Sequence, residues 1–378
     1  HEWDLIEKSL QNDPFWYFLS NEAGPTQNRI GLLFDLVASN DGMPERSASD
    51  AYAVFYHFSR NLNATGADIE AEWLRIKQIF MTLEEWFEDR RLFHIVGFLV
   101  HTGVSVNKLL ELTRGNPKDV FERSLRDLVF RSIIGDIPSE ISREVIEERI
   151  GETLGSIHYD RHKPRIRSVL LLFNVATLLE NTASNIRFQF DSFKKGEWDI
   201  EHVRSISPDY LNTPGRRKEW LLEVRTYLES QDFTDDERKV ESQNSNEEYL
   251  SSIDEFLAYD NPKSRVHEFN ELYEKLVSLF GEKTESEPDH SIANLVLLDA
   301  KTNRSYNNAV FALKRQRLLK LDRAGIFVPL CTRNVFLKCY SDRVKNVMFW
   351  KNEDGAAYSK AMMKTLTNFF LGETETTL

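Results

Sequence analysis

The sequence predicts a mostly α-helical protein with a small α+β module in its second half. Two observations support this fold class. Apolar residues recur at three- and four-residue steps through most of residues 1–185, which is typical of amphipathic helices. The pattern then changes: Ile186 to Phe190 alternates apolar and polar residues with period two, as a half-buried strand does. We therefore expect a helical domain at about 1–185 and a mixed module at about 186–378.

The expected helices of the first domain follow from this periodicity and from capping residues. Asn12-Asp13-Pro14 places a capping side chain before a proline in the first helical turn. The most apolar pattern covers 165–180, so that segment is expected to be a core helix. Helical patterns cover residues 29–37, 51–60, 69–89, 92–101, 106–113, 117–133, 141–150 and 165–180.

The second module is expected to combine short strands with helices. Strand patterns cover 186–190, 198–206 and 293–298. A polar, strongly acidic segment at about 209–290 is helical in patches and looks like an insertion within the module. A basic amphipathic helix is expected at 305–321, an apolar segment at 326–339 and a last helix at 356–370.

Composition excludes several classes of protein. With 41% hydrophobic and 29% charged residues, the 378-residue chain is an ordinary globular protein. No apolar run reaches the roughly 18 residues that a membrane-spanning helix needs, so no membrane partner is expected. The first residues do not resemble a signal peptide. Cys331 and Cys339 fit neither a CxxC redox pair nor a zinc knuckle, so we expect reduced thiols in a cytoplasmic protein, with one disulfide as the alternative.

Charge is distributed unevenly along the chain. The net charge of −12 alone argues against a nucleic-acid partner. However, residues 301–351 contain twelve Lys or Arg against two Asp. A solvated helix face is one interpretation of this segment. Its position directly after the candidate catalytic residues favours the other interpretation, a surface that faces phosphates.

The search for chemical motifs leaves one stretch of interest. There is no GxGxxG, GxxxxGK[ST], GxSxG or HExxH pattern and no Cys/His cluster typical of zinc sites. His57, His94 and His101 lie within helical patterns, where a structural role is expected. His158 and His162 flank a polar turn and could contact a ligand. His202 differs, because it follows a carboxylate in an apolar, strand-like stretch.

At this point the chain resembles a known family. Residues 198–203, Trp-Asp-Ile-Glu-His-Val, resemble the Glu-His strand of HNH nucleases in GmrSD-type, modification-dependent restriction enzymes. Residues 292–298 resemble the Gly-Asn-Leu strand of the same family, although Ala293 replaces the usual Gly. The family's later Asn, Asn, Phe and Lys positions are matched by Asn303, Asn308, Phe311 and Lys314. The ordered set is more specific than any one of its parts.

The resemblance implies a ββα-metal nuclease domain and a role for each matched residue. His202 would be the general base, since an imidazole accepts protons near neutral pH. A magnesium or manganese ion would be bound by oxygen ligands. Asn294 would fix the loop that holds His202. The metal ligands would be Glu201, Asn303 and Asn307, with Asn303 also catalytic. Asn308, Lys314 and Arg315 would contact the DNA backbone.

The family also implies a setting for this activity. Its members usually begin with a ParB-like NTPase domain that carries an Asp-Gly-Gln-Gln-Arg motif, and no such motif occurs here. We therefore expect this chain to be the C-terminal part of a phage-defence enzyme that cuts or nicks phage or modified DNA. Two alternatives stay open: a catalytically silent helical module that binds DNA or protein, and an RNA-cutting toxin with the same chemistry.

Overall fold

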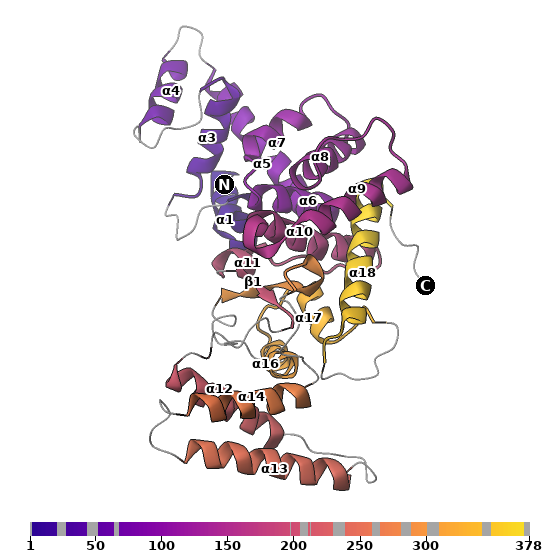
Figure 1. The fold of residues 1–378 in the computed structure, drawn as a ribbon. Helices are drawn as coiled ribbons and strands as arrows, with labels where there is room; N and C mark the ends of the chain where they lie inside the picture. Colours follow the sequence, from indigo (N-terminus) through magenta and orange to yellow (C-terminus); the bar gives the residue numbers. More distant parts are fainter. Residues whose placement is uncertain are drawn as a thin grey trace. The chain divides into compact units, whose positions relative to one another are not determined.

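The computed structural model describes most of the chain and divides it into two compact units (Figure 1). Unit 1 comprises 1–150, 171–196 and 365–378, and unit 2 comprises 151–170 and 197–364. The division expected at about residue 185 lies close to Gly196, where the chain leaves unit 1 for unit 2. The units are not continuous in sequence, however: 151–170 belongs to unit 2 and 365–378 belongs to unit 1. The described residues are 2–20, 28–43, 52–63, 68–196, 198–204, 211, 213–229, 239–258, 265–280, 289–300, 310–341 and 349–373.

Unit 1 is built around one fully buried helix. Helix α6 is buried continuously from Leu92 to Val100, and α2, α5 and α8 pack against it. A helix that is apolar on all sides must be surrounded by other elements, and this arrangement provides them. The unit contains α1 (Glu2–Gln11), α2 (Asp13–Leu19), α3 (Gly31–Asn40), α4 (Ala53–Leu62), α5 (Ile69–Glu88), α6 (Arg90–His101), α7 (Val106–Thr113), α8 (Lys118–Ile133), most of α9 (Arg143–Ser156), the second half of α10 (Tyr159–Glu180) and α11 (Phe190–Lys195).

The prediction of a strand at 186–190 is wrong. The segment is extended up to residue 189, and α11 begins at Phe190. The alternation itself is real, because Phe188 and Phe190 are buried and Gln189 is exposed. The backbone of this segment, however, does not pair with a neighbouring strand at Phe188: the Phe188 amide donates to Nε2 of the His94 side chain at 3.0 Å. Gly97 allows Phe190 to approach α6, because a Cβ there would lie 2.3 Å from the ring.

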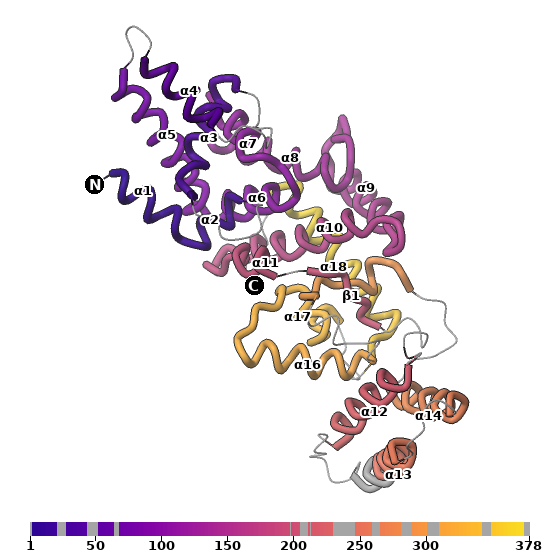
Figure 2. The backbone as a smooth tube through the Cα atoms, turned by 90° about the vertical axis from the view of Figure 1, so that its left-hand side faces the viewer, coloured from indigo at the N-terminus to yellow at the C-terminus, as the bar shows by residue number. Residues whose placement is uncertain are grey.

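Unit 2 contains a two-stranded antiparallel sheet followed by helices (Figures 1 and 2). Strand β1 (Trp198–His202) pairs with β2 (Leu295–Asp299). Helix α17 packs against β2, and α16 packs against α17. The unit also contains the first half of α10, α12 (Pro214–Glu229), α13 (Lys239–Leu257), α14 (Val266–Leu279), the 3₁₀ helix η2 (Ile292–Asn294), α16 (Phe311–Arg323), α17 (Leu330–Phe336) and most of α18 (Asn352–Leu371).

The acidic segment expected as a helical insertion does separate the two strands. Helices α12, α13 and α14 lie between β1 and β2 in the sequence, and α13 packs against both of the others. Trp220 is nearly fully buried and its ring lies 4.9 Å from that of Tyr273. These helices therefore have an apolar core of their own, and α12 also packs against α16.

Several expected boundaries differ from the observed ones. The strand expected at 198–206 ends at His202, where the backbone bends. The first two residues of the strand expected at 293–298 lie in the 3₁₀ helix η2, and β2 starts at Leu295. The apolar segment at 326–339 contains helix α17. In the described part of the chain, no helix is long and apolar enough to cross a membrane.

The buried imidazole of His94 predicts that stability depends on pH. Its Nδ1 donates to the Arg90 carbonyl at 2.6 Å and its Nε2 accepts from Phe188, so the neutral ring satisfies both contacts. Burial lowers the pKa of His94 from 6.5 to about 4. Between these values the unfolded chain binds a proton that the folded chain does not. The free energy of unfolding should therefore fall with decreasing pH, by up to about 1.4 kcal/mol per pH unit from this group.

Urea unfolding of the wild type and of His94→Gln, measured from about pH 7 to about pH 5, tests this linkage. We expect a shallower pH dependence in His94→Gln. The control is His267→Gln, because His267 is an exposed histidine of α14. Equal slopes in His94→Gln and the wild type would contradict the assignment.

Candidate functional site

The candidate site lies at the end of β1 in unit 2. His202 is the last residue of the strand, pairs with Leu295 of β2 and is only 8% exposed. The phenol of Tyr358 donates to the Leu295 carbonyl at 3.1 Å, which fixes this end of the ladder. Burial alternates along β1, so His202 and Glu201 occupy opposite sides of the strand, as strand geometry requires.

Lys314 holds the strand from the side of Glu201. Its Nζ lies 2.6 Å from Oε1 of Glu201 and donates to the His202 carbonyl at 2.6 Å. The side chain of Lys314 is 1% exposed. The expectation that Lys314 contacts the DNA backbone is therefore corrected, because its ammonium group is buried within the unit. The lysine acts on the site from inside, by neutralising Glu201 and fixing the backbone of His202.

Asn294 connects the two sides of the bend that follows His202. Its Oδ1 accepts from the Arg204 amide at 2.8 Å, and its Nδ2 donates to the carbonyls of Arg204 and Asp289 at 3.4 and 3.0 Å. The Asn294 carbonyl also accepts from the Val203 amide at 2.8 Å. Asn294 is 2% exposed, so these bonds are shielded from water. The side chain thus ties the loop after His202 to the start of β2.

A second histidine faces His202. Nε2 of His202 lies 3.2 Å from Nδ1 of His290, within hydrogen-bonding distance. Nε2 of His290 in turn lies 3.7 Å from a carboxylate oxygen of Asp160. The ring of Tyr159 packs edge-on against His202, with centroids 4.4 Å apart, and stacks parallel to His290 at 6.0 Å. These four side chains form one cluster, which we call the His202 cluster.

Two segments far apart in the sequence are joined to form this cluster. The Tyr159 amide donates to the His290 carbonyl at 3.2 Å, and His158 forms a β-bridge with Ser291. Helix α10 is kinked at His162, where φ is −126° and ψ is 27°. Pro164 explains the irregular first turn, because proline has no N–H and its ring crowds the carbonyl four residues earlier. The kink leaves residues 158–162 with a backbone that can pair outside the helix.

The electrostatic surroundings keep His202 neutral. Burial, together with the positive charge of Lys314, lowers the pKa of His202 from 6.5 to about 3. Burial also raises the pKa of Glu201, whereas Lys314 acts in the opposite direction. At neutral pH the imidazole of His202 therefore carries one proton and one lone pair. The same lowered pKa makes this ring a weaker base than a free imidazole, because a general base works best with a pKa near the working pH.

The structure reaches only part of the expected metal site. Asn303, Asn307 and Asn308 lie outside the described residues. Among the residues that are described, no group of three or more His, Cys, Asp or Glu is arranged to hold a metal ion. Glu201 is the one expected metal ligand among the described residues, and its Oε1 forms an ion pair with Lys314. A cation at Glu201 would share the carboxylate with the Lys314 ammonium and would need further oxygen ligands.

In the described part of the basic stretch at 301–351, four of the eight Lys and Arg residues pair with carboxylates, Lys314 among them. Arg317 pairs with Glu223, Arg333 with Asp322, and the buried Lys338 with Asp354. Arg315, expected to bind DNA, donates to the Phe336 carbonyl at 3.0 Å and is partly buried. The exposed cations of this stretch in the described structure are Lys320, Arg323 and Lys351. Counting charges along the sequence thus overstated the phosphate-facing surface here.

Three members of the His202 cluster were not identified from the sequence as site residues. Tyr159 and Asp160 lie inside the polar turn between His158 and His162, which was noted only for its histidines. His290 lies in the polar end of the insertion, where nothing in its neighbours distinguishes it. One sequence signal could have pointed to this region. Pro164 directly precedes the helical pattern at 165–180, and a proline there indicates an irregular turn beside His158 and His162.

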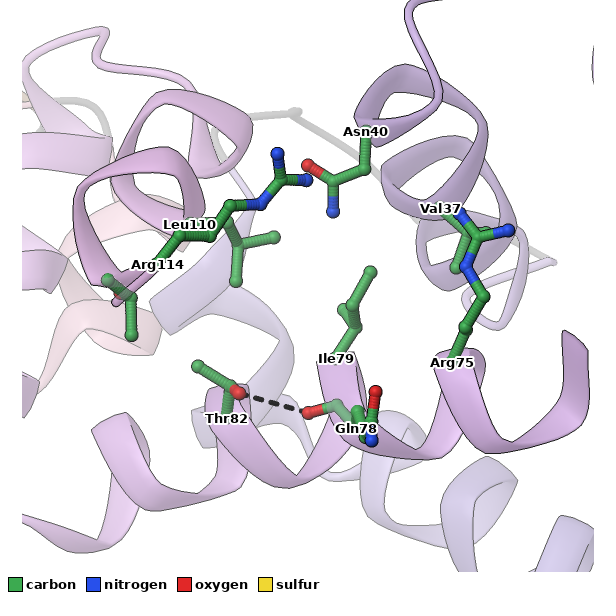
Figure 3. A pocket seen from close by; sticks show the side chains of 9 residues that line it. Val37, Asn40, Arg75, Gln78, Ile79, Thr82, Leu110 and Arg114 are labelled. Carbon is green, nitrogen blue, oxygen red and sulfur yellow. Dashed lines mark hydrogen bonds between the residues drawn. The ribbon is translucent and has the colours of Figure 1, made fainter. Parts of the chain in front are cut away.

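A separate pocket of about 320 Å³ lies in unit 1, between α3, α5 and α7 (Figure 3). Arg114 and Asn40 point toward one another across it, and Ile79, Gln78 and Thr82 of α5 lie below them. Arg75, on its rim, pairs with Glu72 at 3.1 Å and with Asp41. None of the described residues that line the pocket is His, Cys, Asp or Glu, so these residues offer no general base. On chemical grounds the His202 cluster is therefore the better candidate for catalysis.

Comparison with known proteins adds no relative to this picture: no protein family, curated protein or solved structure matches the chain.

Removing the buried cation at the site should be costly. In Lys314→Met the carboxylate of Glu201 stays buried without its partner, and the His202 carbonyl loses a donor. We expect a loss of about 3–5 kcal/mol in the free energy of unfolding. The double variant Glu201→Gln/Lys314→Met should recover part of this loss, because it removes the unpaired charge.

Urea unfolding measures the effect. Lys320→Met, on an exposed position of the same helix, is the matched control and should change stability by less than about 0.5 kcal/mol. If Lys314→Met is as mild as Lys320→Met, the ion pair does not support the site.

Proposed function

We propose that this protein is an HNH-type nuclease that cuts or nicks DNA with His202 as the general base. The observation that carries the proposal is the sequence neighbourhood of Glu201 and His202 at the end of β1, with β2 and α16 following later in the chain, although the two side chains leave the strand on opposite sides. The resemblance of residues 198–203 and 292–298 to the HNH signature supports the same assignment. The ββα-metal arrangement, formed by β1, β2 and α16, is part of this proposal.

The proposed reaction is hydrolysis of a phosphodiester bond. His202 takes a proton from a water molecule, the water oxygen bonds to phosphorus, and the bond from phosphorus to the leaving sugar oxygen breaks. The leaving oxygen then takes a proton from solvent, and the imidazolium of His202 returns its proton to solvent. Lys314 and Asn294 hold the backbone on either side of the ring, so its position is fixed before the substrate arrives.

A divalent cation, magnesium or manganese, is part of the proposal. When bound, it would supply positive charge to the scissile phosphate. Glu201 is the described residue that would hold it, and the resemblance implies Asn303 and Asn307 as further ligands. The role of Asn308 at the DNA backbone is proposed on the resemblance alone. The cytoplasmic setting, the modified or phage DNA and the defence role rest on the same resemblance.

A plasmid-nicking assay with the full chain tests the function. His202→Ala should slow nicking by about 10²- to 10⁴-fold, the usual contribution of a general base. Chelation of divalent cations should abolish nicking by the wild type. His267→Ala, which removes an exposed histidine of α14, is the matched control and should nick at the wild-type rate.

Three outcomes would decide against the proposal. Equal rates for His202→Ala and the wild type would remove His202 from the mechanism. Binding of DNA with no nicking under any divalent cation would favour a catalytically silent module. Cleavage of RNA in preference to DNA would point to an RNA-cutting enzyme with the same chemistry.

A further inference from the structure

The partners of His290 restrict which of its ring nitrogens carries a proton. Nε2 of His290 faces the Asp160 carboxylate at 3.7 Å. An ionised carboxylate only accepts hydrogen bonds, so a lone pair on Nε2 would face negative charge. The neutral ring is therefore favoured with its proton on Nε2. Nδ1 of His290 is then left with a lone pair.

This lone pair restricts His202 in turn. The two facing nitrogens, Nε2 of His202 and Nδ1 of His290, are 3.2 Å apart, and a hydrogen bond between them needs one proton. Because Nδ1 of His290 is the acceptor, Nε2 of His202 must be the donor. The only other nitrogen of His202, Nδ1, then has the lone pair. At 3.7 Å the exposed carboxylate acts on His290 by electrostatic attraction and not through a hydrogen bond, and the contact between the two rings extends its effect to His202.

The packing of the cluster fixes the orientation of the two imidazole rings. Tyr159 contacts both of them, edge-on to His202 and parallel to His290. Its backbone amide binds the His290 carbonyl, so ring and backbone are fixed by the same residue. The ammonium group of Lys163 lies 4.2 Å from the centroid of the Tyr159 ring. Neither imidazole can rotate freely without losing these contacts.

We propose that His290 and Asp160 are positioning residues that hold His202 in the Nε2–H tautomer, so that Nδ1 of His202 is the nitrogen that accepts the proton from water. This inference rests on the proposed function for its catalytic part. Its structural part, the tautomer, stands independently of any nuclease activity. When Nδ1 accepts a proton, the Nε2–H bond to His290 remains, and Asp160 stabilises the positive charge through His290.

Histidine-selective ¹⁵N NMR of the full chain, at about pH 8 where free imidazoles are neutral, tests the tautomer directly. We expect Nε2 of His202 to be protonated and Nδ1 to be bare in the wild type. In His290→Ala the two nitrogens should move toward the averaged signals of a free imidazole. A wild-type His202 protonated on Nδ1 would overturn the proposal, whether or not the protein cuts DNA.

Kinetics test the positioning role. His290→Ala should lower kcat for plasmid nicking by about 10- to 100-fold with little change in KM, as loss of an orienting partner does. His290→Asn places an amide oxygen where Nδ1 stood, so it should restore most of the activity. His267→Ala again serves as the control. If His290→Ala nicks like His267→Ala, or if Asn restores nothing beyond Ala, His290 does not position the base.

If the wild type nicks no DNA, the proposed nuclease function fails, and the NMR result alone decides the tautomer. If the wild type nicks DNA and the NMR result is reversed, the nuclease stands and the role of His290 fails. The two failures are therefore distinguishable.

Discussion

The arrangement of the site depends on one buried ammonium group. Lys314 reaches from α16 to β1, where it pairs with Glu201 and binds the backbone oxygen of His202. A buried carboxylate without a partner is strongly unfavourable, so these two charges must be kept together. Because the lysine binds side chain and backbone at adjacent residues, it fixes the direction of the strand end. The position of His202 follows from that constraint.

The other side of the strand is organised by hydrogen bonds between polar residues that are distant in sequence. Asn294 closes the bend after His202, and the backbone of Tyr159 joins the segment before β2 to the start of α10. Asn294 is 2% exposed, so a missing partner for its amide would be costly, whereas Tyr159 and His290 are half-buried. Because the residues of the His202 cluster contact one another, we expect a substitution at one of them to change the positions of the others.

Several features of the fold could be predicted from the sequence, because they depend on local patterns. The helical character of the first half, the core segment at 165–180 and the strand at 198–202 follow from periodicity and burial. The strand at 186–190 could not be distinguished from an extended segment, since both bury alternate residues. Its partner is His94, whose contact is tertiary. The same limit applies to the site. Adjacent residues such as Glu201 and His202 can be identified from the sequence, whereas His290 and Asp160 join the site through long-range contacts. Half of the described cations in the basic stretch pair with carboxylates of the protein itself.

The long separation of β1 and β2 along the chain has a consequence for folding. Three helices intervene between His202 and its strand partner Leu295, so the sheet is a contact of high sequence separation. Such contacts form late, because the entropy of closing the intervening loop must be lost before the pairing stabilises anything. During synthesis, β1 leaves the ribosome well before β2 and α16 exist. The nascent chain therefore cannot form the pairing of β1 with β2, or the contact of Lys314 with Glu201, until most of unit 2 has been made.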